Sequence, residues 1–167
     1  MKKVVAAVLV TGLAFTGLSA PSAMAASGNT MQSVKQLQQD DDTLEGVTLG
    51  QSIESVLKGQ DKSAYSFRPD GKEHYYEFEK DNGTLLVTAN GKKDHGKVTH
   101  ISMSYKSNGP TYKAVKKAVS DNAVYREHYN SVSGNFGYIE DNNVSYQFGS
   151  DSPDDTRIKL YRIDIEK

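Results

Sequence analysis

The sequence predicts an α+β fold made of two tandem units, each a helix followed by an antiparallel β-meander, with the helices packed on one side of the sheet. Two amphipathic helical segments are each followed by runs of alternating apolar and polar residues, and turn sequences separate these runs. A shift of sixty residues also aligns the strand at 98–105 with residues 158–165, so that Ile101 falls on Tyr161. This alignment favours an internal repeat.

The first 25 residues have the three parts of a secretory signal peptide. Lys2-Lys3 supply positive charge, Val4 to Leu18 form an apolar run, and Ala23-Met24-Ala25 is a small-residue cleavage sequence. The apolar run is shorter than the roughly twenty residues of a membrane span. We therefore expect cleavage after Ala25 and a secreted, extracellular mature chain, 26–167, that is not attached to a membrane.

The composition excludes several classes of site. The chain has no cysteine, which removes disulfides, thiolate metal sites and thiol nucleophiles. Two lysines and no acids lie in the signal peptide, so cleavage changes the formal net charge from −1 to −3. Nucleic-acid binding depends on concentrated Lys and Arg, and this weakly acidic chain is not expected to bind nucleic acid as its main role.

The mature chain is expected to form one domain with three parts. Residues 26–45 are a polar leader, either partly disordered or a short helix on a narrow apolar stripe. The first repeat covers 46–107 and the second covers 108–167, and each would hold one helix and one meander.

The first predicted helix covers Thr48–Leu57. Thr48 and Gln51 have the spacing of a capping box, Ile53 and Val56 share an apolar face, and Gly59 is placed to end the helix.

The second predicted helix covers Thr111–Val119, with Pro110 preceding it. Its outward residues Lys113, Lys116 and Lys117 are a compact basic cluster.

Strands are predicted where side chains alternate between apolar and polar. The runs that show this pattern in the first unit are Ala64–Phe67, His74–Glu79, Thr84–Thr88 and Val98–Tyr105. In the last strand the alternation directs Tyr161 and Ile163 inward, and Leu160 and Arg162 outward. Each strand should therefore have one core side and one solvent side.

The segment from Gly46-Val47-Thr48 to Gly59, together with the later strands, resembles the small repeat of beta-lactamase inhibitory protein and of the outer-membrane SmpA/OmlA lipoproteins. This resemblance implies a tandem-repeat fold and an inhibitor-like role. The chain departs from the pattern at Gln60, where a proline often follows the glycine, and it lacks the cysteines of the inhibitory protein.

The signal peptide, the absence of cysteine and the run from Val47-Thr48-Leu49 through the strands at 75–78 and 98–105 are also similar to small secreted staphylococcal antigens such as immunodominant antigen B. That resemblance implies a secreted, non-enzymatic antigen, with extracellular nucleic acid as a secondary partner.

Catalytic and metal-binding patterns are not found in the sequence. The histidines at 74, 95, 100 and 128 lack the helical spacing of a zinc site. Ser131-Val132-Ser133-Gly134 lacks the first glycine of a nucleophile elbow, and the acidic turns lack the ligand spacing of a calcium loop. We therefore expect a protein that is not an enzyme and uses no cofactor or metal.

Tyrosine is frequent in the strands, and tyrosine on a solvent face is well suited to protein recognition. The candidate binding patch on the solvent side of the sheet comprises Tyr75, Glu77, His100, Leu160 and Arg162. We expect a monomeric protein that recognises or inhibits an extracellular protein through this patch. The alternative is binding of an extracellular polyanion or nucleic acid through Lys113, Lys116 and Lys117.

Overall fold

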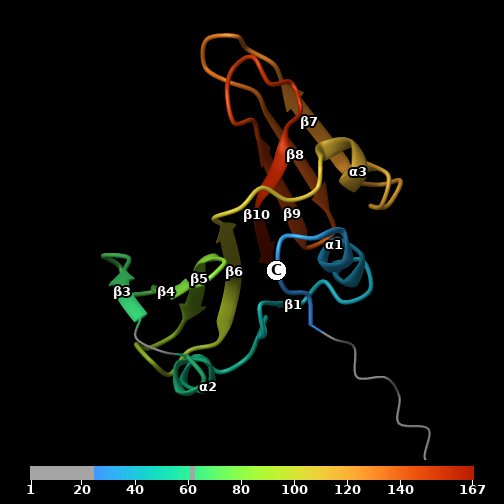
Figure 1. The fold of residues 1–167 in the computed structure, drawn as a ribbon. Helices are drawn as coiled ribbons and strands as arrows, with labels where there is room; N and C mark the ends of the chain where they lie inside the picture. Colours follow the sequence, from blue (N-terminus) through green and yellow to red (C-terminus); the bar gives the residue numbers. More distant parts are fainter. Residues whose placement is uncertain (1–24, 61–62) are drawn as a thin grey trace, which may run out of the picture.

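The computed structural model describes residues 25–60 and 63–167, and the predicted signal peptide lies outside this part except for Ala25. Its main element is an eight-stranded antiparallel sheet with the strand order β3-β4-β5-β6-β10-β9-β8-β7 (Figure 1). The strands β6 and β10 are adjacent at the centre, and β3 and β7 are the two edges. The sheet is therefore continuous across both halves of the chain.

The elements have the following bounds. The sheet contains β3 (Ser63–Phe67), β4 (Glu73–Lys80), β5 (Gly83–Asn90), β6 (Val98–Tyr105), β7 (Val124–His128), β8 (Phe136–Asp141), β9 (Val144–Gly149) and β10 (Lys159–Glu166). A separate two-stranded sheet contains β1 (Thr43–Leu44) and β2 (Val47–Thr48). The helices are α1 (Met31–Leu37), α2 (Ile53–Lys58) and α3 (Tyr112–Lys116).

The predicted α+β fold of two tandem helix-plus-meander units is wrong. The described part of the molecule is mostly β, because its helices span only seven, six and five residues and its long strands join one sheet. The sixty-residue alignment also fails in the last strand. Tyr161 is 40% exposed, whereas Ile101, the residue aligned with it, is fully buried.

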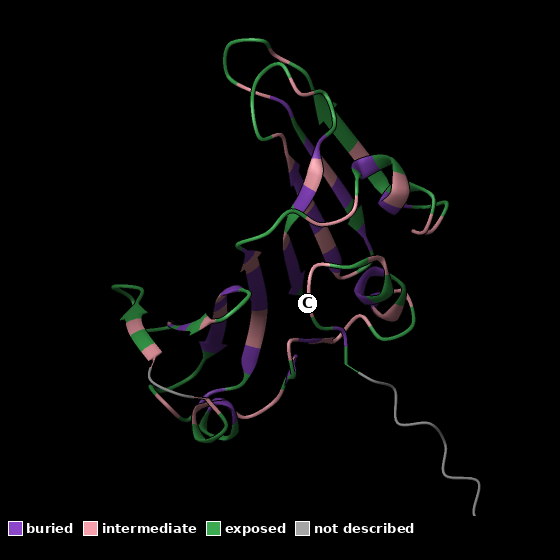
Figure 2. Ribbon diagram, in the orientation of Figure 1, coloured by how far each residue is buried: buried purple, intermediate pink, exposed green. Residues whose placement is uncertain are grey.

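One hydrophobic core lies against a single face of the sheet. Figure 2 shows that buried residues recur along the central strands. At the centre, Met103 on β6 pairs with Ile163 on β10, and Ile101 pairs with Ile165. All four side chains are fully buried. The three helices contribute Val34, Ile53 and Val115, among other residues, to the same core. Burial of this apolar surface is the main favourable contribution to folding.

The helix α2 begins at Ile53, five residues later than predicted, because the backbone turns at Gly50. Gly50 has a left-handed φ of +79°, and its N–H donates to the carbonyl of Val98 at 2.8 Å. The side chain of Gln51 accepts a hydrogen bond from the N–H of Thr48 at 3.0 Å. The predicted capping contact is therefore present, but Thr48 belongs to β2 and not to a helix.

The helix α3 is also shorter than predicted. Thr111 precedes it as the N-cap, and its hydroxyl oxygen accepts a hydrogen bond from the N–H of Ala114 at 3.3 Å. The helix ends at Lys116, three residues before the predicted end at Val119.

A register shift in β10 reverses the predicted directions of two side chains. Leu160 pairs with Phe148 and Arg162 pairs with Gln147, so Tyr161 is an extra residue between two consecutive pairs of the β9 register. A bulge of this kind changes the alternation on one side of the extra residue. As a result Leu160 is fully buried, and Tyr161 is 40% exposed.

The segment 26–45 is an ordered part of the fold. Thr30 caps α1 by accepting a hydrogen bond from the N–H of Ser33, and the buried side chains of Val34 and Leu37 join the core. The side-chain amide of Asn29 donates to the carbonyl of Leu160 at 2.8 Å, which attaches this segment to β10. Among the described residues, no helix has the length and apolar character needed to cross a membrane.

Candidate functional site

The candidate site lies on the side of the sheet opposite the core, which we call the open face. One row of side chains crosses the open face on all eight strands. In strand order, this central row contains Ala64, Glu77, Leu86, Ser102, Asp164, Ser145, Glu140 and Val124. It is polar in the middle and carries an exposed glutamate toward each end. This pattern is typical of a sheet face that is not covered by a helix.

Asp164 is the centre of the most extensive polar network on the open face. Its carboxylate accepts hydrogen bonds from Arg162 Nη2 at 2.7 Å and from Arg162 Nε at 2.9 Å. Gln147 Nε2 donates to the second carboxylate oxygen at 2.9 Å, and His100 Nε2 lies 3.4 Å from the first. Asp164 is only 7% exposed and has lost most of its contact with water. These partners supply the hydrogen bonds that water would make to an exposed carboxylate.

The partners of Asp164 also determine the pKa of its carboxyl group. Burial raises the pKa of the carboxyl group, but hydrogen bonds from His100, Arg162 and Ser102 lower it by more, and the net effect is a lowered pKa. Asp164 is therefore ionised under all but strongly acidic conditions. The network joins a buried negative charge to the half-buried guanidinium group of Arg162.

Four of the five residues in the predicted binding patch lie on the open face. Tyr75 is half-buried, and its hydroxyl donates to Glu73 Oε2 at 2.7 Å, which raises the pKa of Tyr75. Tyr75 pairs with Thr88, which pairs in turn with His100, so Tyr75 and His100 share one row. The exposed Glu77 lies on the central row, three strands from Asp164.

The prediction for Leu160 is wrong, because the bulge at Tyr161 directs the Leu160 side chain into the core. His100 and Arg162 are brought together, but through Asp164, which was not among the predicted site residues. The alternation of β10 already placed Asp164 on the same side as Arg162, and that signal could have identified it.

Two small pockets lie on the open face. One has a volume of about 110 Å³ and is lined by Tyr75, Glu77 and Leu86 together with residues of β3. The other has a volume of about 200 Å³, and its lining includes Glu140, Asp164 and Glu166. Each pocket is comparable in size to a single side chain of a partner, and neither is large enough for a drug-sized ligand.

The geometry does not favour catalysis on this face. Thr88 Oγ1, His100 and Asp164 form a series that superficially resembles a hydroxyl–imidazole–carboxylate triad. The distance from Thr88 Oγ1 to His100 Nδ1 is 3.5 Å, longer than the contact of an activated nucleophile, and Thr88 is only 6% exposed. Within residues 25–60 and 63–167, no group of three or more His, Cys, Asp or Glu side chains is placed to hold a metal ion.

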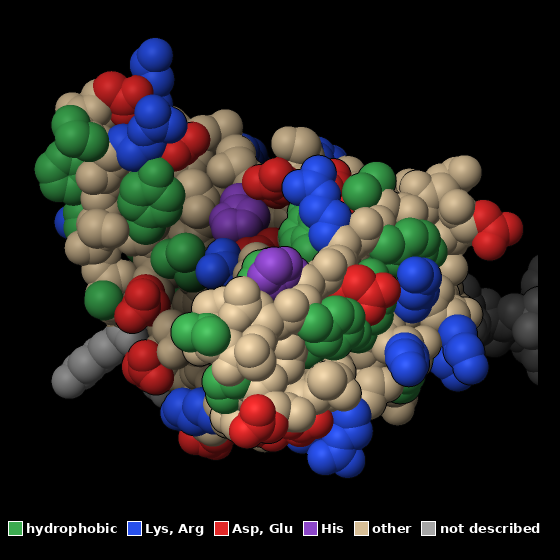
Figure 3. Space-filling view, turned by 90° about the horizontal axis from the view of Figure 1, so that it is seen from above, with side chains coloured by type: hydrophobic (Ala, Val, Ile, Leu, Met, Phe, Trp, Pro, Cys, Tyr) green, Lys and Arg blue, Asp and Glu red, His purple; other side chains and the backbone are tan. Residues whose placement is uncertain are grey.

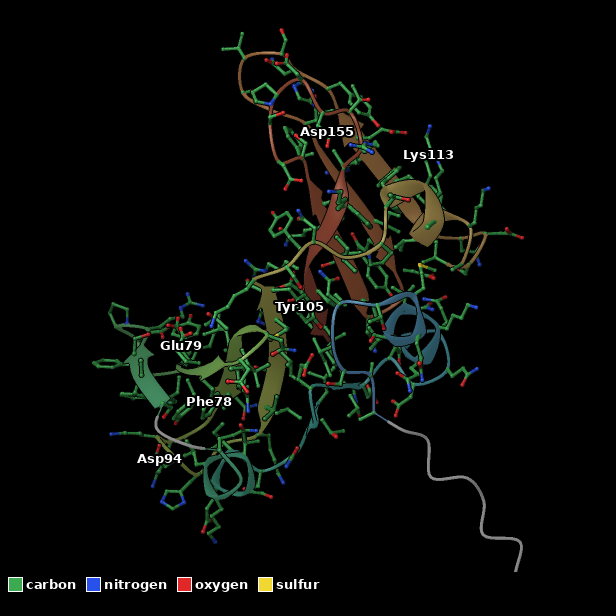
Figure 4. All side chains as sticks on the ribbon, viewed as in Figure 1. Phe78, Glu79, Asp94, Tyr105, Lys113 and Asp155 are labelled. Atoms are coloured by element: carbon green, nitrogen blue, oxygen red, sulfur yellow. The ribbon has the colours of Figure 1, made fainter. Side chains whose placement is uncertain are left out.

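The predicted polyanion site lies on α3. Lys113, Lys116 and Lys117 are exposed, and the ammonium group of Lys116 lies 4.6 Å from the centroid of the Tyr125 ring. Figure 4 shows Lys113 on α3 and Asp94 in the β5–β6 loop at opposite ends of the molecule. The lysines of that loop, at 92, 93 and 97, therefore do not extend the basic cluster of α3.

The surface carries no large area of a single charge sign in the view from above. Figure 3 shows histidine side chains in a hollow of the surface, with acidic, basic and hydrophobic side chains around it. Such a mixed surface is characteristic of protein contacts more than of nucleic-acid contacts.

A family model described as SA0570-like matches residues 1–166, which is almost the whole chain. This description names neither beta-lactamase inhibitory protein, nor the SmpA/OmlA proteins, nor antigen B, and the comparisons do not support those resemblances. No curated protein and no solved structure matches the chain.

Proposed function

The chain belongs to the SA0570-like family, and from this premise we propose that it is a secreted, non-enzymatic protein that binds an extracellular protein through the open face of its sheet. Secretion is inferred from the signal-peptide features of residues 1–25. An inhibitor-like action would follow if the partner is a hydrolase whose active site the open face occludes.

The main support is the arrangement of the open face. Tyr75, Glu77, His100 and Arg162 come from three different strands and lie on one side of a continuous sheet whose other side is filled by the core. A sheet of this kind is a rigid platform, so binding would order few side chains and would lose little conformational entropy. Tyrosine and arginine are also the side chains most often found at the energetic centres of interfaces.

The test begins with chain 26–167 immobilised and exposed to extracellular proteins and host serum. A protein that remains bound at moderate salt becomes the reference partner. The double variant Y75A/R162A should weaken binding of that partner by about tenfold or more, because it removes two contacts of the open face and leaves the apolar core unchanged. It also removes the guanidinium partner of Asp164, so urea unfolding of the variant must show that the protein is folded under the binding conditions. Full retention of binding by this variant contradicts the proposal.

The matched control changes the same two residue types at a different place. Tyr129 is 46% exposed, the side chain of Arg157 is 77% exposed, and neither residue belongs to a strand of the sheet. The variant Y129A/R157A should bind the partner as the unmodified chain does. Circular dichroism of both variants checks that the fold is intact.

A second candidate function is binding of an extracellular polyanion by Lys113, Lys116 and Lys117. The observation that favours it is their shared exposure on one short helix. Binding of this kind should fall steeply as salt is added, because it depends on release of counterions. The same pull-down therefore separates the two functions when the bound fraction is assayed for both protein and nucleic acid.

A further inference from the structure

The open face differs in charge from the basic helix α3. Its strands direct six carboxylates to that side, at Glu73, Glu77, Glu79, Glu140, Asp164 and Glu166, and three cations, at Arg126, Lys159 and Arg162. With histidines neutral, the face has a formal charge of −3. A partner with the opposite charge would be attracted to it and oriented by it.

Several of these charged groups already have ion-pair partners. Arg162 is bound to Asp164, and Lys159 Nζ lies 3.0 Å from Asp151 Oδ2. Glu73 lies 3.2 Å from Arg68, and Glu79 lies 4.0 Å from Lys106. By contrast, no described cation forms an ion pair with Glu77, Glu140 or Glu166. These three exposed glutamates are therefore available to charges from outside the molecule.

The three glutamates lie beside the two open-face pockets. Glu77 lines the pocket of about 110 Å³, where Tyr75 and Leu86 supply apolar walls. Glu140 and Glu166 line the pocket of about 200 Å³ together with Tyr138 and with Lys167, whose ammonium group lies 3.9 Å from Asp42 Oδ2. Glu140 accepts a hydrogen bond from the Tyr138 hydroxyl at 3.1 Å. Each pocket thus combines an aromatic side chain with a carboxylate that has no cation partner among the described residues, which suits the alkyl stem and the charged head group of lysine or arginine.

The sheet sets the distance between these two positions. Glu77 and Glu140 lie on the same central row, and five interstrand steps separate β4 from β8. Neighbouring strands are about 4.8 Å apart, so the two glutamates are separated by about 24 Å along the sheet. Between them the row contains Leu86, serines and the neutralised Asp164.

We propose that the protein partner presents lysine or arginine side chains at two positions about 24 Å apart, one for the pocket at Glu77 and one for the pocket at Glu140 and Glu166. This inference rests on the proposed function, since it gives the chemistry of the partner that the open face would recognise. It also assigns ligands of opposite charge to the two sides of the molecule. Positively charged groups would bind to the open face, and negatively charged groups would bind to α3.

The probe is a synthetic fluorescent peptide with a lysine cluster at each end of a glycine linker of roughly eight extended residues, enough to span about 24 Å. A peptide with a single lysine cluster and a peptide with glutamate in place of lysine serve as comparisons. Fluorescence anisotropy with chain 26–167 at about 20 mM salt limits screening of the charges. The peptide with two clusters should bind about tenfold more tightly than the peptide with one, because the second contact is intramolecular.

The variant E77Q/E140Q/E166Q should lose about tenfold or more of the affinity for the peptide with two clusters. The matched control E54Q/D121N/D154N changes the net charge equally at exposed acids outside the sheet strands and should keep that affinity. Equal weakening in both variants, tighter binding of the glutamate peptide, or no binding of any lysine peptide would each overturn the inference. These outcomes leave the proposed function standing, because that function is tested with the natural partner and Y75A/R162A.

Discussion

The two faces of the sheet reach low exposure by different physical means, as the neighbouring residues Ile163 and Asp164 illustrate. Ile163 is fully buried among apolar side chains, and Asp164 on the opposite face is 7% exposed among Arg162, His100 and Gln147. The stability contributed by Ile163 depends on area and packing, whereas that of Asp164 depends on ionisation and on its partners. The contribution of the core face therefore does not depend on pH, whereas that of Asp164 is lost in strong acid.

The largest expected effect is on the core side, at the bulge of β10. Leu160→Ala should lower the free energy of unfolding by about 2–5 kcal/mol, because it leaves a cavity next to Phe148. The neighbouring variant Tyr161→Ala should cost less than about 1 kcal/mol, because that side chain is largely exposed. Urea unfolding of both variants measures the difference. A larger loss for Tyr161→Ala would show that the bulge is absent.

A smaller effect is expected on the open face, at Asp164. Asp164→Asn should lower the free energy of unfolding at pH 6 by about 1–3 kcal/mol, because hydrogen bonds to a charged group are lost. The folded pKa of Asp164 is lowered, so its contribution is present above the unfolded pKa of about 3.9 and is lost as the pH falls through the folded pKa. The difference between the two proteins should thus shrink from pH 6 toward pH 2.

Urea unfolding of the unmodified chain and of Asp164→Asn across that pH range provides the measurement. Asp154 is exposed and has no ion pair among the described residues, so Asp154→Asn is a suitable control with little expected effect. A constant difference between Asp164→Asn and the unmodified chain at every pH would contradict the role given to the carboxylate.

The smallest effects should come from two buried tyrosine hydroxyls. The hydroxyl of Tyr105 donates to Glu45 Oε1 at 3.1 Å, and Tyr105→Phe should cost about 1 kcal/mol. The hydroxyl of Tyr112 is buried and has no hydrogen-bond partner among the described residues. Tyr112→Phe should therefore leave stability unchanged or raise it by about 1 kcal/mol. Thermal unfolding followed by circular dichroism compares the two, and an equal loss in both would refute this distinction.

The sequence was informative wherever a local pattern decides the structure. The alternation in 98–105 predicted β6 with its correct bounds. The alternation of β10 gave a wrong prediction for Leu160 and Tyr161. The bulge arises from pairing with the neighbouring strand β9, and no residue type near Tyr161 indicates it. The helix at Thr48 was predicted too early for a similar reason, since the turn at Gly50 is fixed by a hydrogen bond to Val98 on a distant strand.

The candidate site was predictable in part. The open-face positions of Tyr75, Glu77, His100 and Arg162 followed from alternation alone, and the buried position of Leu160 did not. The pairing of β6 with β10 brings His100 to Asp164, and this contact between residues 64 positions apart in the sequence could not be derived without the strand order. Strand order is a global property, so local patterns do not determine it.

The two edges of the sheet have a consequence for handling and engineering of the protein. An edge strand presents unpaired backbone groups that can template cross-β association with another chain. On β7 the residues Arg126 and Glu127 place charges along the edge, and Arg68 and Pro69 follow directly after β3. Charge and proline at such places act as gatekeepers against aggregation, so these four residues should be kept when the surface is redesigned.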